Sequence, residues 1–166
     1  MKHSGESFGH AEILLVDDSP GDIRLTREAL RDTTCPIHLH VAIDGLEAMS
    51  FLRREERHAL APRPDLILLD LNLPKMGGLE VLAQIKADDT LKTIPTIILT
   101  TSEAESDIAR SYELNANCFV SKPVQLYAFD RLVKSINDFW LRKAVLPRCR
   151  NVDVGQVEYA TAHGRS

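Results

Sequence analysis

Five short apolar runs recur along the chain, separated by amphipathic stretches that are each long enough to form a helix. The runs cover residues 13–16, 37–41, 66–69, 97–99 and 118–120. Four of them are continuously apolar, which is typical of parallel strands covered on both faces, whereas the run at 37–41 alternates with histidines and predicts an edge strand. Because parallel strands are joined by right-handed helical crossovers, the pattern predicts an α/β fold, a (βα)5 doubly wound parallel sheet.

The helix signals agree with this division. Ser19 followed by Pro20 is typical of an N-cap and the first position of a helix, and Asp44 precedes the next amphipathic stretch as a second N-cap. The closing helix is predicted over residues 126–141, where apolar side chains recur at helical spacing. Those side chains are Leu126, Phe129, Val133, Ile136 and Trp140.

A chain of 166 residues is long enough for one domain with a real core, which we place at residues 11–146. Residues 1–10 and 147–166 lack periodicity, so we expect two flexible tails, the second of them basic. No apolar run approaches the ~20 residues of a membrane span, and the first residues lack the apolar stretch of a signal peptide. We therefore expect a cytoplasmic protein without membrane contact.

The net charge and the cysteine spacing argue against a nucleic-acid-binding protein, a disulfide-stabilised protein and a zinc protein. The 20 Lys and Arg residues against 24 Asp and Glu residues give a net charge of −4, which argues against a nucleic-acid binder. The stretch after the closing helix is too short for a helix-turn-helix module, so we expect no DNA-binding domain and output through contact with a target protein. Cys35, Cys118 and Cys149 are far apart and odd in number, which fits neither a disulfide framework nor zinc-ligand spacing. Cys118 is expected to pack as a small apolar side chain.

Polar residues follow the central strands at the points where those strands end. They are Asp17, Asp18, Asp70, Thr100 and Lys122. A single Asp after a strand is equally explained as a helix cap, but ligands of open α/β sheets bind at the carboxyl ends of the strands, where all five residues converge. Clustered carboxylates repel one another unless a cation lies among them, which in an oxygen-only site means Mg²⁺ or Mn²⁺. Because Mg²⁺ usually adds phosphate oxygens to one or two carboxylates, the set also predicts a phosphoryl group that Lys122 and Thr100 can bind.

With these residues in order and the loop LPKMGG at 73–78, the chain resembles the receiver domain of two-component response regulators over residues 11 to about 141. The resemblance implies the flavodoxin-like receiver fold with strand order 2-1-3-4-5. It also implies that Asp70 is the phosphoacceptor and that Lys122 pairs with the phosphoryl group. The implied ligands of Mg²⁺, for which Mn²⁺ can substitute, are Asp17, Asp18, Asp70 and the backbone carbonyl of Asn72.

By the same resemblance, a partner histidine kinase presents a phosphohistidine that the Asp70 carboxylate attacks in line. The chain is then a signalling phosphoacceptor rather than an enzyme, assisting its own Mg²⁺-dependent phosphorylation and dephosphorylation. Thr100 would swing toward the phosphoryl group and Phe119 would turn inward, changing the face formed by the fourth helix, fifth strand and fifth helix. Without the resemblance, the simplest interpretation of Phe119 is a strand side chain facing the core. Thr101 stands where receivers often have Ala or Gly, so its bulk is expected to narrow the path to Asp70.

Two further stretches, residues 17–30 and 136–141, resemble the small stand-alone regulators paired with bacterial and cyanobacterial phytochromes, the red-light-sensing histidine kinases. They imply a phytochrome-type kinase as partner. The closing helix also carries more apolar residues than one core-facing stripe needs, which predicts a homodimer. Its interface residues would be Leu126, Phe129, Phe139 and Trp140. Alternatively, Phe139 and Trp140 close the bottom of the core.

Two other functions stay open at this point. A phosphohydrolase with an aspartyl-phosphate intermediate would resemble this chain, but such enzymes usually carry a second Asp two residues after the nucleophile, where this chain has Asn72. A receiver-like adaptor that works without phosphorylation is disfavoured by the intact set of site residues. Of the remaining features, His38 and His40 share one face of their strand without further metal ligands in the sequence, and residues 53–64 are expected to form a solvated helix end and loop.

Overall fold

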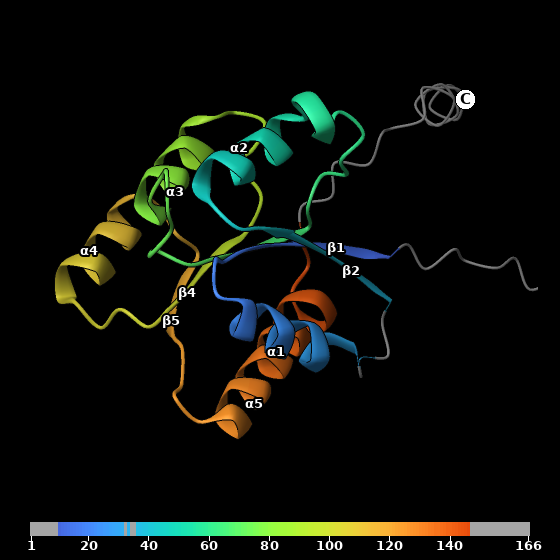
Figure 1. The fold of residues 1–166 in the computed structure, drawn as a ribbon, viewed down its shortest axis with the longest axis vertical. Helices are drawn as coiled ribbons and strands as arrows, with labels where there is room; N and C mark the ends of the chain where they lie inside the picture. The colour runs from blue at the N-terminus through green and yellow to red at the C-terminus, as the bar shows by residue number, and fades with distance from the viewer. Residues whose placement is uncertain (1–9, 32, 34–35, 147–166) are drawn as a thin grey trace, which may run out of the picture.

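The computed structural model of the chain describes residues 10–31, 33 and 36–146, whose arrangement is shown in Figure 1. Strands and helices alternate as the spacing of the apolar runs predicts. The elements are β1 (Ala11–Val16), α1 (Pro20–Arg31), β2 (Ile37–Ala42), α2 (Gly45–Arg53), the 3₁₀-helix η1 (Glu56–His58), β3 (Leu66–Leu69), α3 (Gly78–Ala87), β4 (Thr96–Thr100), α4 (Glu105–Glu113), β5 (Cys118–Ser121), α5 (Leu126–Asn137) and the π-helix η2 (Asp138–Lys143). Apart from His10, the two predicted tails lie outside the described residues, as do Cys35 and Cys149. No described helix is long and apolar enough to cross a membrane.

All five strands are parallel and form one sheet in the order β2-β1-β3-β4-β5. Figure 1 shows α1 and α5 on one face of this sheet and α2, α3 and α4 on the other. The arrangement confirms the doubly wound sheet with strand order 2-1-3-4-5. Because β1, β3, β4 and β5 are neighbours in the sheet, the residues that follow them meet at one edge.

Residues alternate between the two faces along each central strand. On β1, Leu14 and Val16 belong to the core beneath α2 and α3, whereas Ile13 and Leu15 belong to the core beneath α1 and α5. Most of β1 and all of β3 and β4 are buried, as predicted for strands covered on both faces. Burial on two faces holds these strands firmly, so the side chains at their ends share a rigid frame.

The two edge strands carry different sequence patterns. β2 lies at one edge, as its alternating pattern predicts, and β5 lies at the other, although its apolar run is as continuous as those of the central strands. Cys118 and Val120 pack toward α1 and α5, while Phe119 packs toward the opposite core. All three side chains are only half-buried, because no strand among the described residues pairs with the outer side of β5. The packing of Cys118 is as predicted.

Hydrogen bonds confirm both predicted N-caps. The backbone N–H of Asp22 donates to Ser19 Oγ at 3.3 Å, and that of Glu47 donates to Asp44 Oδ1 at 2.8 Å. These bonds satisfy N–H groups that have no partner inside the first turn of each helix. They therefore explain why α1 and α2 begin directly after the strand-end loops.

The closing helix begins at Leu126 as predicted but differs from its prediction in where it ends and in the burial of its first residue. α5 ends at Asn137 instead of continuing to residue 141, and the chain goes on as the π-helix η2. Phe129, Val133 and Ile136 are buried as expected. Leu126 is 66% exposed, so the core-facing stripe begins one turn later than its apolar residues predict.

Two glycines allow the loops at the strand ends to pack closely. A Cβ atom on Gly78, the first residue of α3, would lie 2.2 Å from the carbonyl oxygen of Asp70. A Cβ atom on Gly45, the first residue of α2, would lie 2.2 Å from the carbonyl oxygen of Met76. Such distances are far below van der Waals contact, so only glycine lets α3 begin against the end of β3 and lets the 73–78 loop approach α2.

Candidate functional site

The side chain of Lys122 lies at the centre of the site. Its Nζ donates to Asp17 Oδ2 at 2.6 Å and to Asp70 Oδ2 at 2.8 Å. The three side chains are at most 9% exposed. The residues predicted from three separate strand ends therefore form one buried ion-pair network.

Backbone pairing carries each of these side chains to the shared edge. Asp70 follows β3, and its N–H donates to the carbonyl oxygen of Val16 on the neighbouring β1 at 2.9 Å. Lys122 follows β5, and its N–H donates to the carbonyl oxygen of Thr100 on the neighbouring β4 at 2.8 Å. The sheet ladder thus continues up to the functional residues and fixes their backbone.

Both buried carboxylates are also held through their second oxygen. Asp17 Oδ1 accepts from the backbone N–H of Ser19 at 2.9 Å, and Asp70 Oδ1 accepts from that of Asn72 at 3.2 Å. Each carboxylate therefore has one oxygen bonded to the backbone and one to Lys122. The role of the Asn72 carbonyl as a metal ligand stays a prediction.

Asp18 adds a third carboxylate on the solvent side. One oxygen from each of Asp17, Asp18 and Asp70 lies within 4.8 Å of the other two, and Asp18 is exposed whereas the others are buried. Carboxylate oxygens are the ligands that hard divalent cations prefer, and water can complete their coordination on an open side. The donor set therefore fits a divalent cation.

A further carboxylate, which the sequence pattern does not indicate, completes the surroundings of Lys122. Asp22, in the first turn of α1, accepts a third hydrogen bond from Lys122 Nζ at 2.9 Å. Acidic residues are common in first turns because they complement the helix dipole. No local signal therefore distinguishes Asp22 as the partner of a lysine 100 positions away.

The site is short of positive charge. Burial alone would lower the pKa of the Lys122 ammonium, but its hydrogen bonds to Asp17, Asp70 and Asp22 raise that pKa well above its ordinary value. Burial raises the pKa of Asp17, and the hydrogen bond from Lys122 only partly offsets this. One ammonium shared among three carboxylates cannot stabilise each of them fully, so a divalent cation would favour their ionised form.

Thr100 and Phe119 lie on the adjacent strands β4 and β5. Thr100 is fully buried, and its hydroxyl oxygen accepts from the backbone N–H of Ser102 at 3.3 Å. Phe119 is half-buried against the core that α2 and α3 cover. Thr101, which follows Thr100, is exposed. The predicted movement of Thr100 and Phe119 stays a prediction.

An open groove of about 520 Å³ adjoins the site. Asp18 of the carboxylate cluster lines it, together with residues from the first turns of α1. Its lining residues are Asp18, Pro20, Ile23, Arg24, Arg27, Ile43 and Pro74. The groove combines apolar side chains with two arginines next to the carboxylate cluster.

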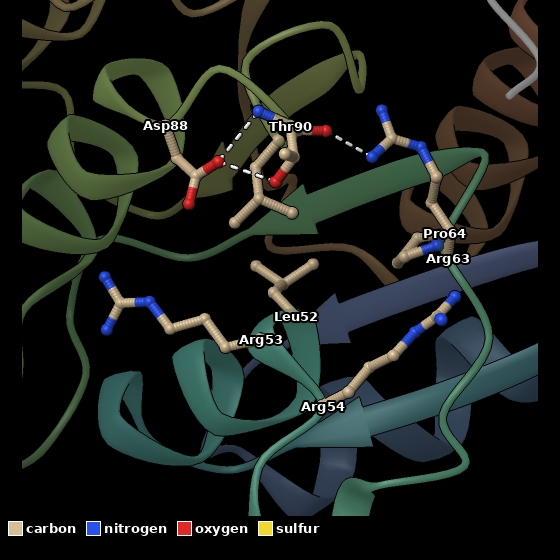
Figure 2. A pocket seen from close by; sticks show the side chains of 8 residues that line it. Leu52, Arg53, Arg54, Arg63, Pro64, Asp88 and Thr90 are labelled. Carbon is tan, nitrogen blue, oxygen red and sulfur yellow. Dashed lines mark hydrogen bonds between the residues drawn. The ribbon is translucent and has the colours of Figure 1, made fainter.

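A second cavity, of about 430 Å³, lies at the opposite, amino ends of β3 and β4 (Figure 2). It is lined by Leu52, Arg53, Arg54, Arg63, Pro64, Asp88, Thr90 and Leu91. Arg63 donates to the carbonyl oxygen of Thr90, and Arg53 donates to Gln84 Oε1 at 3.1 Å. Asp88 Oδ1 accepts from both the N–H and the hydroxyl of Thr90. Arg53, Arg63, Asp88 and Thr90 are thus hydrogen-bonded within the protein.

The predicted dimer residues divide into two groups. Leu126 and Phe139 are 66% and 54% exposed, and Trp140 is half-buried beside Phe139. The prediction of Phe129 as an interface residue is wrong, because its side chain is only 2% exposed and packs in the core between α5 and the sheet. Its position at helical spacing from Val133 accounts for this burial.

The other features singled out in the sequence lie away from the site. His38 Nδ1 and His40 Nε2 are hydrogen-bonded to opposite oxygens of Glu12, at 3.0 Å and 2.6 Å. Because the two rings engage different oxygens, they form a hydrogen-bonded cluster on the edge strand and do not converge on a metal position. Residues 53–64 are a largely exposed loop around η1, as predicted.

The doubly wound sheet and the lysine–carboxylate network at its carboxyl edge are together typical of a receiver-type signalling domain. A family model of the response regulator receiver domain matches residues 13–137, and the chain belongs to this family. It is a signalling protein of the two-component type.

Individual relatives narrow the comparison. Response regulator Rcp1 of Synechocystis sp. is 47% identical over 144 residues, which cover 87% of this chain and 98% of Rcp1. A crystal structure of the phosphorylated cyanobacterial phytochrome response regulator RcpA has a TM-score of 0.83 at 51% identity, covering 84% of this chain and all of RcpA. The Mn²⁺-bound form of Rcp1 has a TM-score of 0.81 at 47% identity, covering 83% of this chain and 99% of Rcp1. The chain is therefore homologous to phytochrome response regulators.

Proposed function

We propose that this chain is a stand-alone response regulator that accepts a phosphoryl group on Asp70 from the phosphohistidine of a phytochrome-type histidine kinase. The observation that carries the proposal is the hydrogen bond of 2.8 Å from Lys122 Nζ to Asp70 Oδ2. Asp70 also belongs to a cluster of carboxylates that fits a divalent cation. The kinase type is supported by RcpA, a phytochrome response regulator that is 51% identical to this chain.

In the proposed step, an oxygen of the Asp70 carboxylate attacks phosphorus in line while the bond from phosphorus to the imidazole nitrogen breaks. The imidazole leaves with the electron pair and takes up a proton, so the products are an acyl phosphate and neutral histidine. Lys122 is placed to donate to a phosphoryl oxygen, because its Nζ already lies beside Asp70. Its raised pKa keeps the ammonium charged throughout the physiological range.

The proposed metal is Mg²⁺, with Mn²⁺ as a substitute. Its ligands would be Asp17, Asp18, Asp70 and the backbone carbonyl of Asn72. When bound, the ion would neutralise part of the charge that develops around the transferred phosphoryl group. The excess of carboxylates over ammonium groups in this site supports the proposal, as does the Mn²⁺ held by the related Rcp1.

The proposed output is a shift of the surface formed by α4, β5 and α5. Thr100 would turn its hydroxyl toward the phosphoryl group, and Phe119 would fill the space that this movement vacates. The burial of Thr100 and the half-burial of Phe119 on the next strand support this coupling. Phosphorylation would then favour one of two existing arrangements.

We also propose that α5 and η2 form a homodimer interface. Leu126 and Phe139 are large apolar side chains exposed on these elements, and the ring of Trp140 contacts that of Phe139 with centroids 5.4 Å apart. Aromatic side chains are enriched at interfaces, and two-fold dimers are the commonest assembly. The buried Phe129 is left out of the proposed interface.

The groove beside Asp18 supports contact with a partner kinase. The proposed location is the cytoplasm, where ATP is present to phosphorylate the histidine of that kinase. The apolar Ile23 and Ile43 lie in it next to Arg24 and Arg27. A docked partner would therefore meet apolar surface within reach of the carboxylate cluster.

The two alternative functions have less support. A phosphohydrolase needs a proton-carrying side chain near the acyl phosphate, whereas Asn72 has a neutral amide. A phosphorylation-independent adaptor would not need an acidic cluster built around a buried lysine. Burying these charged groups costs desolvation energy. A phosphoryl-transfer reaction at the site explains why the chain has such a cluster.

Phosphotransfer from a phytochrome-type kinase tests the proposal. The chain is incubated with candidate kinases, ATP and Mg²⁺, and the phosphorylated residue is located by mass spectrometry. We expect label on Asp70 and none in Asp70→Asn. The matched control is Asp89→Asn, whose side chain is 91% exposed and ion-paired with Lys92, and which should be labelled like the wild type.

Other outcomes would contradict the proposal in distinct ways. Full labelling of Asp70→Asn would remove Asp70 as the acceptor. Kinase binding without any label would favour the adaptor. Steady release of phosphate from a phosphomonoester would favour the hydrolase.

A further inference from the structure

Every hydrogen-bond donor of the Lys122 ammonium is already occupied by a carboxylate. An ammonium group has three N–H donors. The partners of Nζ are Asp17 at 2.6 Å, Asp70 at 2.8 Å and Asp22 at 2.9 Å. A phosphoryl oxygen that arrives at Asp70 can therefore bond to Lys122 only if one of these carboxylates gives up its place.

Asp22 is the partner whose release costs least. Its side chain is 29% exposed, whereas those of Asp17 and Asp70 are 2% and 9% exposed. Water can solvate the Asp22 carboxylate once it leaves Lys122, but a buried carboxylate would lose its partner without gaining water. Asp22 also makes the longest of the three bonds.

We propose that Asp22 is a positioning residue that competes with the incoming phosphoryl group for the third N–H donor of Lys122. The inference rests on the proposed phosphorylation of Asp70. In the resting protein, Asp22 holds the ammonium on the α1 side of the site. When the phosphoryl group arrives, Lys122 exchanges Asp22 for a phosphoryl oxygen while keeping its bond to Asp17, and no covalent bond to Asp22 forms or breaks.

This competition affects the two directions of the reaction differently. The bond between Asp22 and Lys122 is present before phosphoryl transfer and absent in its transition state, so it slows phosphorylation. Hydrolysis begins from the phosphorylated protein, in which Lys122 has already exchanged its partner. Removing the Asp22 charge should therefore speed phosphorylation and leave the rate of hydrolysis nearly unchanged.

The experiment compares wild type with Asp22→Asn, using phosphoramidate and Mg²⁺ as the phosphodonor so that no kinase has to dock against α1. Asparagine keeps the shape of the side chain and leaves the backbone bond from Asp22 to Ser19 Oγ in place. We expect phosphorylation to be about three- to tenfold faster. Hydrolysis should stay within about twofold of wild type.

A matched control separates this local competition from a general loss of negative charge. Glu28→Gln removes one charge from the same helix, and Glu28 pairs with the exposed Arg24 rather than with Lys122. We expect its rates to equal those of wild type. A second variant, Asp22→Ala, should behave like Asp22→Asn, with thermal unfolding measured to confirm that α1 is intact.

The outcomes separate the inference from the proposed function. If wild type is phosphorylated on Asp70 and Asp22→Asn shows an unchanged forward rate, the competition is wrong while the proposed function stands. Equal acceleration in Glu28→Gln, or parallel changes in both rates of Asp22→Asn, would also overturn it. A wild type that is not phosphorylated on Asp70 would overturn the proposed function, and the inference with it.

Discussion

The phenol oxygen of Tyr112 accepts a hydrogen bond from the backbone N–H of Phe119 at 3.2 Å. Tyr112 belongs to α4 and is 50% exposed, whereas Phe119 belongs to β5, which has no partner strand on its outer side within residues 10–146 as far as these are described. The bond satisfies an N–H group that a sheet edge would otherwise leave to solvent. It also ties α4 directly to the residue of the proposed switch.

Removing the Tyr112 hydroxyl should loosen this link. In Tyr112→Phe we expect the Phe119 amide hydrogen to exchange with solvent about two- to tenfold faster. The reason is that a hydrogen bond of this kind stabilises the protected state by about 0.5–1.5 kcal/mol. Hydrogen exchange followed by NMR measures this rate. Tyr127→Phe is the control, since Tyr127 is exposed on α5 and contacts Arg131. Unchanged protection of Phe119 in Tyr112→Phe would show that the bond has no role in solution.

Asp44 should make a pH-dependent contribution to stability. The Asp44 carboxylate accepts a hydrogen bond from the backbone N–H of Glu47 and lies 3.4 Å from the Lys75 ammonium. Both contacts lower the pKa of the Asp44 carboxyl. A lowered pKa in the folded state means that the stabilisation is complete above the unfolded value of about 3.9 and is lost as the pH falls through the folded value. We expect Asp44→Ala to lower the free energy of unfolding by about 1 kcal/mol at pH 7.

The difference between wild type and Asp44→Ala should shrink as the pH falls below about 4, as measured by urea unfolding at each pH. Asp44→Asn serves as the control, because an amide also caps a helix and does not titrate in this range. If the loss of unfolding free energy in Asp44→Ala were the same at every pH, the charge of the Asp44 carboxylate would not be what stabilises α2.

Thr101 should limit access to Asp70. It is exposed directly after β4 and follows the buried Thr100. We expect Thr101→Ala to speed both phosphorylation by acetyl phosphate and hydrolysis of the acyl phosphate, each by about two- to fivefold. This parallel change differs from the one-sided effect predicted for Asp22→Asn. Stopped-flow and radiolabel-decay measurements give the two rates, and unchanged values for both would show that the side chain lies outside the path.

The exposed apolar residues of α5 and η2 should mediate self-association. Phe139→Ser removes a ring that is 54% exposed, so it should weaken the proposed dimer without opening the core. Sedimentation at micromolar concentration, with and without phosphorylation, measures the effect. Leu60→Ser is the control, because Leu60 is 98% exposed on the loop around η1. A wild type that stays monomeric in both states would reject the interface.

The sequence predicts most of the fold because its signals are local. Apolar runs define strands, and Ser19 and Asp44 cap helices through bonds to residues three positions away. Where burial depends on distant elements, the prediction fails. Leu126 has the helical spacing of the core-facing stripe, and only the packed structure shows that it is exposed while Phe129 is buried.

In the candidate site, too, local sequence signals locate some residues, whereas others depend on the packing of distant elements. Strand ends locate Asp17, Asp70 and Lys122, since parallel strands bring their carboxyl ends together. Asp22 could not be found this way, because it follows no strand and its acidic character suits any helix start. Its partnership with Lys122 depends on how α1 packs across the sheet edge, which local sequence does not encode.

Metal-dependent acceptance of a phosphoryl group by Asp70 is the step on which the proposed function depends most. Mass spectrometry of the protein after incubation with phosphoramidate, in Mg²⁺ or in excess chelator, tests this directly. We predict a single phosphoryl group on Asp70 in Mg²⁺ and none in chelator or in Asp70→Asn. A phosphoryl group that still forms in chelator, or that forms on another residue of the wild type, would contradict the role of Asp70 as a metal-dependent phosphoacceptor.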